Sequence, residues 1–320
     1  MTGEVADDVL REMAEAGNAV AVREYGMRLV RRQQGDEAAA WLYRAATAGD
    51  VDAAHKLGVF YFDLKGETSR GLEWWRHAAE RGHTDAAFNL GVVAARGNRL
   101  PEAEQWWRRA GEAGHADSCA KLGAIWAERG NLNGAGYWWE RGAAAGNAEC
   151  AYNAGVLARQ HGDLGRAETW WRRAFDVARH AAAAYNLAVL DEERGNAADA
   201  ERWYRLAADA GDPDAANELG ALHAKRGESA ESERWYRAAA EAGNPEAAHQ
   251  LGEMFKETDL DQAMTWWQRA AERGNGSSAM SLGIAENNRG NRGGAIRWFE
   301  LAAANGEPSA AFVLQSLRNR

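Results

Sequence analysis

Large apolar residues recur along this chain in adjacent pairs at a nearly constant interval. Fourteen of the fifteen tryptophans fall in these pairs, and only Trp126 lies outside them. The leading positions are spaced 31 to 33 residues apart and are Trp41, Trp74, Trp106, Trp138, Trp170, Trp203, Trp235, Trp266 and Trp298. The residue that follows is always large and apolar: Leu42, Trp75, Trp107, Trp139, Trp171, Tyr204, Tyr236, Trp267 and Phe299. A fixed period of this length predicts a solenoid built from one repeated unit.

A small residue forms a second mark, 14 to 16 positions before each leading tryptophan. It is usually preceded by leucine, and its positions are Gly26, Gly58, Gly91, Gly123, Gly155, Ala188, Gly220, Gly252 and Gly283. In the stretch EAEQWWRRAGEAG, Ala103, Trp107 and Ala110 follow the i, i+4, i+7 spacing of one helix face. Each unit is therefore expected to hold two helices. The first helix carries the Leu-Gly mark and the second helix carries the tryptophan pair.

Polar residues and glycines mark the predicted helix ends. Before one first helix, Asn244 is suited to the N-cap position, and Pro245 to the first helical position. After the first helices, glycine is expected to take a left-handed conformation that stops the helix. The glycines predicted to do so are Gly97, Gly130, Gly162, Gly195, Gly227 and Gly290.

The repeats predict one continuous all-α array. We expect an N-terminal capping helix over residues 1–16, nine tandem repeats over 17–305 and a C-terminal capping helix over 306–320. One junction, at Ala178–Ala184, lacks the usual Gly-Asn turn and has high helix propensity, so its two helices are expected to run closer to continuous. This irregularity is either drift within one repeat or a local change of superhelix pitch.

Composition and charge argue against several protein classes. The net charge of −9 disfavours a nucleic-acid binder, and two cysteines exclude a disulfide-dense secreted scaffold. The opening residues show no signal-peptide pattern, and no run of 18 apolar residues exists to cross a membrane. A soluble cytoplasmic protein is the expectation.

The sequence contains no catalytic motif of the metalloprotease, phosphate-loop, serine-hydrolase or CxxC type. His83 and His115 occupy predicted helix-cap positions, and His55 shares one repeat position with the distant His249. The residues Cys119 and Cys150 fall where small packing residues are expected. We therefore expect no catalytic residue, no cofactor and no metal site.

The amino-acid sequence of the units resembles that of the tetratricopeptide repeat (TPR) family and its relative, the Sel-one-like repeat (SLR) family. The stretch WYRAAAEAGNPEAAHQLG, from Trp235 to Gly252, carries the resemblance to the Sel-one-like type. The resemblance implies an all-α, right-handed alpha-alpha superhelix of helix-turn-helix repeats, with the first helices lining the concave face. For function it implies only protein–protein binding, because a fold does not fix a function.

On that implied concave face, three aromatic-asparagine pairs are the candidate partner-binding residues: Phe88 and Asn89, Tyr152 and Asn153, Tyr185 and Asn186. An asparagine side chain both donates and accepts hydrogen bonds, which suits an extended peptide backbone, and the adjacent ring offers an anchor area. The alternative is that these residues serve packing alone.

The hypothesis from the sequence is a scaffold or adaptor that binds another protein or an extended peptide segment through the concave face. The alternative is a regulatory subunit or inhibitor of a single enzyme, and a catalytic protein is the least favoured class. No nucleic acid and no membrane are expected as partners, and self-association stays open.

Overall fold

A computed structural model describes residues 2–32 and 34–318 of the chain. These residues form α-helices and one π-helical turn, and no strand occurs among them. The chain divides into two compact units, the first ending at Trp170 and the second starting at Trp171. Met1 and residues 319–320, which the predicted capping helices include, lie outside the described residues, and the division into caps and nine repeats stays a prediction.

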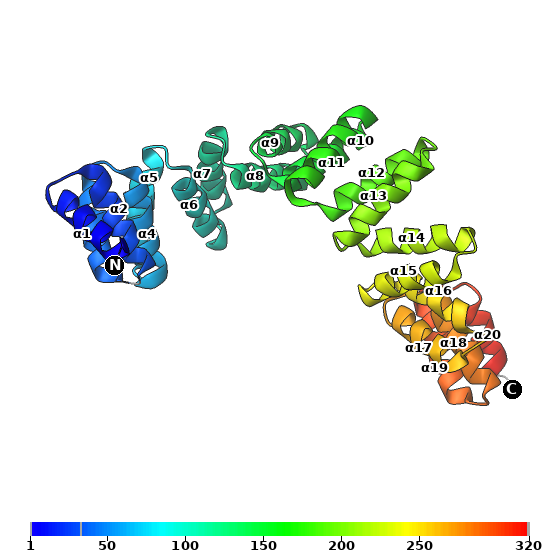
Figure 1. Cartoon of the computed structure of the whole chain (residues 1–320). Helices are drawn as coiled ribbons and strands as arrows, with labels where there is room; N and C mark the ends of the chain where they lie inside the picture. Colours follow the sequence, from blue (N-terminus) through cyan, green and yellow to red (C-terminus); the bar gives the residue numbers. More distant parts are fainter. Residues whose placement is uncertain (1, 33, 319–320) are drawn as a thin grey trace. The chain divides into compact units, whose positions relative to one another are not determined.

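The first unit contains ten whole helices and the start of an eleventh (Figure 1). The whole helices are α1 (Thr2–Glu15), α2 (Ala19–Arg31), α3 (Gly35–Thr47), α4 (Val51–Val59), α5 (Thr68–Glu80), α6 (Thr84–Arg96), α7 (Leu100–Glu112), α8 (Ala116–Glu128), α9 (Leu132–Ala144) and α10 (Ala148–Gln160). The eleventh, α11 (Leu164–Ala178), continues into the second unit.

The second unit continues with the same kind of helix. Its helices are α12 (Ala181–Glu193), α13 (Ala197–Asp209), α14 (Pro213–Lys225), α15 (Ser229–Glu241), α16 (Pro245–Phe255), α17 (Leu260–Ala271), α18 (Gly276–Asn288), α19 (Arg292–Ala304) and α20 (Ala310–Arg318). The even-numbered helices are the first helices of the repeats, and the odd-numbered helices are the second helices. Within each unit, first helices pack on the second helices before and after them in the sequence. The predicted all-α solenoid of helix-turn-helix repeats is confirmed.

The tryptophan pair and the Leu-Gly mark belong to one packing contact. The second member of each pair is generally the buried one, as with Trp107, which is 4% exposed. Its ring lies against the glycine of the preceding first helix, where a Cβ atom on Gly91 would come closer than 3.0 Å to the Trp107 ring. The same close approach occurs at Gly58, Gly123, Gly220, Gly252 and Gly283. At these six marks glycine is therefore required, because an indole, phenol or phenyl ring occupies the space of its side chain.

The predicted helix starts are confirmed. Asn244 caps α16 by accepting a hydrogen bond from the Ala247 amide at 2.7 Å, and Pro245 is the first helical residue. The side chain of every other first-helix cap with a described bond likewise accepts from the amide three residues later. These caps are Asn18, Asp50, His83, His115, Asn147, His180, Asp212 and Asn275.

The predicted left-handed stops are confirmed at five glycines and wrong at one. The confirmed residues are Gly130, Gly162, Gly195, Gly227 and Gly290. At α6 the left-handed residue is Asn98, with φ of 57°, whereas Gly97 has φ of −83°. The left-handed position lies seven residues after the mark in every case, and Gly97 lies only six residues after Gly91. Asparagine takes this position because it tolerates the left-handed region better than most side chains do.

At the irregular junction the two helices run closer to continuous, as expected. Only two residues separate the end of α11 at Ala178 from the start of α12 at Ala181, whereas three residues separate α9 from α10 and α13 from α14. Arg179 takes the left-handed conformation with φ of 51°, and His180 caps α12 through the Ala183 amide at 3.3 Å. The junction therefore keeps a turn between its helices even though its sequence lacks the glycine.

One repeat of the first unit carries an extra residue as a π-helical turn. The turn η1 (Phe60–Leu64) follows α4, and the Lys65 amide donates to the Phe60 carbonyl at 3.1 Å. This repeat is one residue longer than most, with 33 residues between Trp41 and Trp74. A wider turn absorbs the insertion without disturbing the contact between Gly58 and Trp75.

Candidate functional site

The first helices of the first unit form a hollow of about 310 Å³. Its lining comes from α2, α4 and the start of α6, and no second helix contributes. The lining residues are Arg23, Glu24, Met27, Arg31, Asp52, His55, Lys56, His83 and Asp85. We call the surface formed by the first helices of the first unit the first-helix face.

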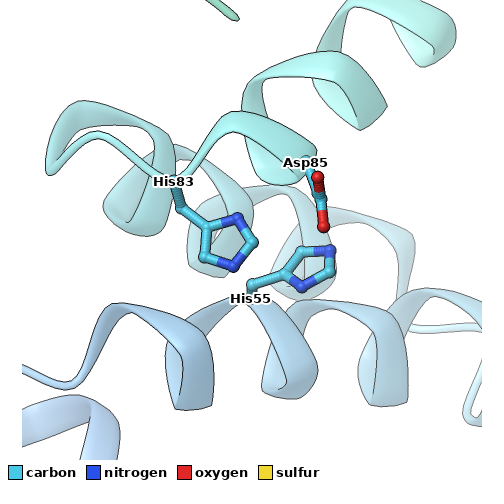
Figure 2. A group of neighbouring side chains, drawn as sticks. All are labelled: His55, His83 and Asp85. Carbon is cyan, nitrogen blue, oxygen red and sulfur yellow. The ribbon is translucent and has the colours of Figure 1, made fainter. Parts of the chain in front are cut away.

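Two histidines and an aspartate meet in this hollow (Figure 2). His55 projects from α4 and is 6% exposed, while His83 and Asp85 come from the first residues of α6. The His55 and His83 rings stack with centroids 4.3 Å apart, and the Asp85 carboxylate points toward the His55 ring. One nitrogen from each histidine and one Asp85 oxygen lie within 4.8 Å of one another.

Hydrogen bonds indicate which nitrogen carries the proton on each ring. The His83 Nδ1 accepts from the Ala86 amide at 3.2 Å, so the ring proton of a neutral His83 is on Nε2, which lies 3.3 Å from Asp52 Oδ1. The His55 Nε2 lies 3.3 Å from the Asn89 amide nitrogen. An amide nitrogen can only donate a hydrogen bond, so the His55 Nε2 is the acceptor. Burial, together with the smaller effects of the neighbouring His83 and Lys56, lowers the pKa of His55 to about 4. His55 is therefore neutral at physiological pH.

The predicted pair Phe88 and Asn89 lies half-buried on α6, next to this cluster. Asn89 contacts His55, and the Phe88 ring stacks on His115 with centroids 4.8 Å apart. The Phe88 carbonyl also accepts from the Trp107 indole at 3.2 Å. Both residues therefore have packing roles within the array, in addition to the surface that they present.

The other two predicted pairs are also half-buried on first helices. Asn153 on α10 donates to Glu149 of the same helix at 3.2 Å. On α12, Tyr185 makes an edge contact with Tyr204, with ring centroids 5.6 Å apart, beside the half-buried Asn186. Tyr152 and Asn153 share a unit with Phe88 and Asn89, whereas Tyr185 and Asn186 belong to the second unit. Their role in partner binding stays a prediction.

A repeating contact explains why His83 and Asp85 lie where they do. The cap side chain of each of several first helices reaches the acidic residue two positions after the preceding cap. These contacts join His83 to Asp52 at 3.3 Å, His115 to Asp85 at 3.4 Å, Asn147 to Asp117 at 2.9 Å, Asn244 to Asp214 at 2.7 Å and Asn275 to Glu246 at 3.1 Å. Each cap thus links neighbouring repeats as well as starting its own helix.

The predicted capping by His83 and His115 is confirmed, but the grouping of His55 with His83 was missed. The signal in the sequence that could have predicted this grouping is the cap position of His83. A residue three before the mark faces the cap of the following first helix, and in the next repeat Phe88 faces His115 in the same way.

The cysteines pack as predicted. Cys119 and Cys150 are free and fully buried, and both lie against Gly142. Burial raises the pKa of Cys150 to about 12, which keeps its thiol protonated. Neither thiol is placed to react.

Arginines of the second helices serve partly as links between repeats. Arg109 donates to the Glu80 carbonyl, and Arg141 to the Gly111 carbonyl, each at 2.8 Å, so each binds the end of the preceding second helix. Others pair with glutamate at i−4, as Arg205 does with Glu201.

None of the helices in the described part of the chain is long and apolar enough to span a membrane.

Comparison with known families matches the Sel1 repeat model along most of the array. The matched segments are residues 14–50, 51–83, 84–115, 116–147, 181–212, 213–244, 245–275 and 289–307. The chain belongs to the Sel1 repeat family. The model leaves residues 148–180 unmatched, which is the repeat that leads into the junction at Arg179.

Two solved structures share the Sel1 repeat fold. The crystal structure of c5321, a protective antigen of uropathogenic Escherichia coli with an SLR fold, has a TM-score of 0.79 and 24% identity, over 96% of this chain and 73% of that one. A Sel1 repeat protein from Oxalobacter formigenes has a TM-score of 0.71 and 28% identity, over 86% of this chain and 89% of that one. No curated protein matches the sequence significantly.

Proposed function

We propose that this Sel1 repeat protein is a scaffold or adaptor that binds a segment of another protein along its first-helix face. Repeat arrays of this type typically serve as protein-interaction scaffolds. The supporting observation is the hollow of about 310 Å³, which is lined only by first helices and their caps. A partner segment that enters the hollow would contact side chains from three successive repeats.

The lining favours a polar segment with an apolar contact point. Arg23, Arg31 and Lys56 offer cations, and acidic side chains lie among them. Met27 supplies a flexible apolar surface that adapts to different partner side chains. On other first helices of the first unit, Phe88 and Asn89 and Tyr152 and Asn153 are the proposed contacts for an extended peptide, and Tyr185 and Asn186 are the proposed contacts on the first helices of the second unit.

Site-specific photo-crosslinking tests which face binds. A benzophenone amino acid at Met27, on α2, is expected to capture a partner from the native lysate, because Met27 lines the hollow. The matched control is the same amino acid at Tyr43, on α3, which is 47% exposed but belongs to a second helix. Capture from Tyr43 and not from Met27 would place the interface on the opposite set of helices. One enzyme captured in equal amounts would favour a regulatory subunit.

A second test concerns the predicted asparagines. Replacing Asn153 and Asn186 together by alanine is expected to leave the thermal melt nearly unchanged, because half-exposed side chains of this kind contribute within about 0.5 kcal/mol. The affinity for the captured partner is expected to fall by about 1–3 kcal/mol, since partner groups lose their hydrogen bonds. Lower stability with unchanged affinity would show that both residues serve packing alone.

A further inference from the structure

The geometry of the hollow points to a metal site. We propose that His55, His83 and Asp85 bind one divalent transition-metal ion of the zinc class, with its remaining coordination open to the hollow. The inference does not depend on the proposed function, because metal binding is measured without any protein partner.

The donor set fits this class of ion. Two imidazole nitrogens and a carboxylate oxygen are ligands that Zn²⁺ and its neighbours in the first transition row prefer, whereas Mg²⁺ and Ca²⁺ favour oxygen alone. The three donor atoms already lie within 4.8 Å of one another. Ligands about 2.1 Å from a shared ion lie at most about 4.2 Å apart, so the side chains must rotate to close the site.

His55 is prepared for a metal in its present state. Its Nε2 holds a lone pair, because the Asn89 amide donates to this atom. Its low pKa keeps the ring neutral, so a metal ion at neutral pH does not have to displace a proton from it. The ion would take the place of the Asn89 amide at Nε2.

His83 must change its protonation to take part. Its Nδ1 accepts from the Ala86 amide, and its Nε2 faces Asp52. A metal ion on Nε2 replaces the proton there, and a ring that is still neutral then carries its proton on Nδ1. The cap bond to Ala86 is lost, and the two stacked rings turn until their lone pairs converge. Metal binding is therefore coupled to loosening of the first turn of α6, and the expected affinity is micromolar rather than that of a closed structural zinc site.

The charged groups near the hollow are of both signs. Asp85 is a ligand, and Asp52 lies 3.3 Å from the ring that would hold the ion. Lys56 and Arg23 oppose the ion from α4 and α2, and Arg23 lies 3.4 Å from Asp50 and 3.7 Å from Asp52. With three ligands from the protein, the ion keeps at least one position for water or for a group that enters the hollow.

The next repeat supplies a matched variant. There Phe88 stands in the place of His55 and stacks on His115, which in turn contacts Asp85. The variant His55→Phe therefore recreates in this repeat a ring contact that already occurs in the next repeat. The control is His249→Phe, at the equivalent position of a distant repeat, where His249 instead contacts Ser278 at 2.8 Å.

The full chain, stripped of metal by a chelator and dialysed, is titrated calorimetrically with Zn²⁺ near pH 7.5. One equivalent is expected to bind, and His55→Phe is expected to weaken that binding at least about tenfold, with circular dichroism unchanged. His249→Phe should bind like the wild type. In nuclear magnetic resonance spectra, Zn²⁺ should shift the His55 and His83 ring protons and speed hydrogen exchange at the Ala86 amide. Unchanged Zn²⁺ affinity in His55→Phe, or no binding by the wild type, overturns the proposal.

Discussion

Replacing Trp107 by alanine is expected to destabilise the first unit by about 3–5 kcal/mol, the range for removing a large buried aromatic side chain. The Trp107 ring is 4% exposed and fills the space above Gly91, and its indole N–H donates to the Phe88 carbonyl. Alanine would leave this space empty between two helices of one repeat. Chemical denaturation followed by circular dichroism measures the loss. A loss below about 1 kcal/mol, typical of surface positions, would contradict the packing described here.

The glycine under the ring provides a second way to examine the same contact. Gly91→Ala is expected to cost about 1–3 kcal/mol, because its methyl group overlaps the indole. The cost should shrink when Trp107→Leu is already present, since Leu42 lies against Gly26 in the first repeat with more space. Gly293→Ala is the control. A Cβ atom there meets nothing within 4 Å, so helix propensity alone should make that change neutral or slightly stabilising.

The repeat architecture was predictable because its signals are local and occur in every unit. The ring at Trp107 and the glycine at position 91 are 16 residues apart, and each recurs with the period of the array. Caps such as Asn244 identify themselves by residue type next to a helix start. The prediction of a left-handed residue at Gly97 was wrong because it used the residue type alone and ignored the distance of the residue from the Leu-Gly mark. The structure shows that the distance decides which residue takes the left-handed position, and Asn98 takes it.

The histidine cluster was not predictable in the same way. His55 and His83 come from neighbouring repeats, and only the packing of α4 against the start of α6 brings their rings together. Taken alone, His83 was explained as a helix cap, and His55 only shared a repeat position with the distant His249. The proposed binding role of Tyr152 and Asn153 cannot be judged from the pattern either, because exposure and intrahelical bonds such as that from Asn153 to Glu149 depend on the folded surroundings. The packing of the helices is needed to reveal that the position three before the mark faces the cap of the following first helix, and once this is known the same contact can be located in the next repeat.

Lowering the pH from 7.5 to 5 is expected to destabilise the first unit by about 2 kcal/mol through His55 alone. An exposed histidine titrates near pH 6.5, and burial lowers the pKa of His55 to about 4 in the folded chain. The unfolded state therefore binds a proton more tightly than the folded state does. Stability is complete above about pH 6.5 and falls as the pH approaches 4, where the total loss reaches about 3 kcal/mol.

The charged groups that face His55 also contribute to its pKa. His83 and Lys56 oppose a proton on the ring, and Asp52 and Asp85 favour one more weakly. With a chelator present, stability is measured by denaturation at several pH values for the wild type, His55→Phe and His249→Phe. The wild type and His249→Phe should lose stability together between pH 7.5 and 5, while His55→Phe should lose about 2 kcal/mol less. Because phenylalanine cannot bind a proton, an equal loss in all three proteins would assign the acid sensitivity to other groups and would mean that His55 is less buried than the structure shows.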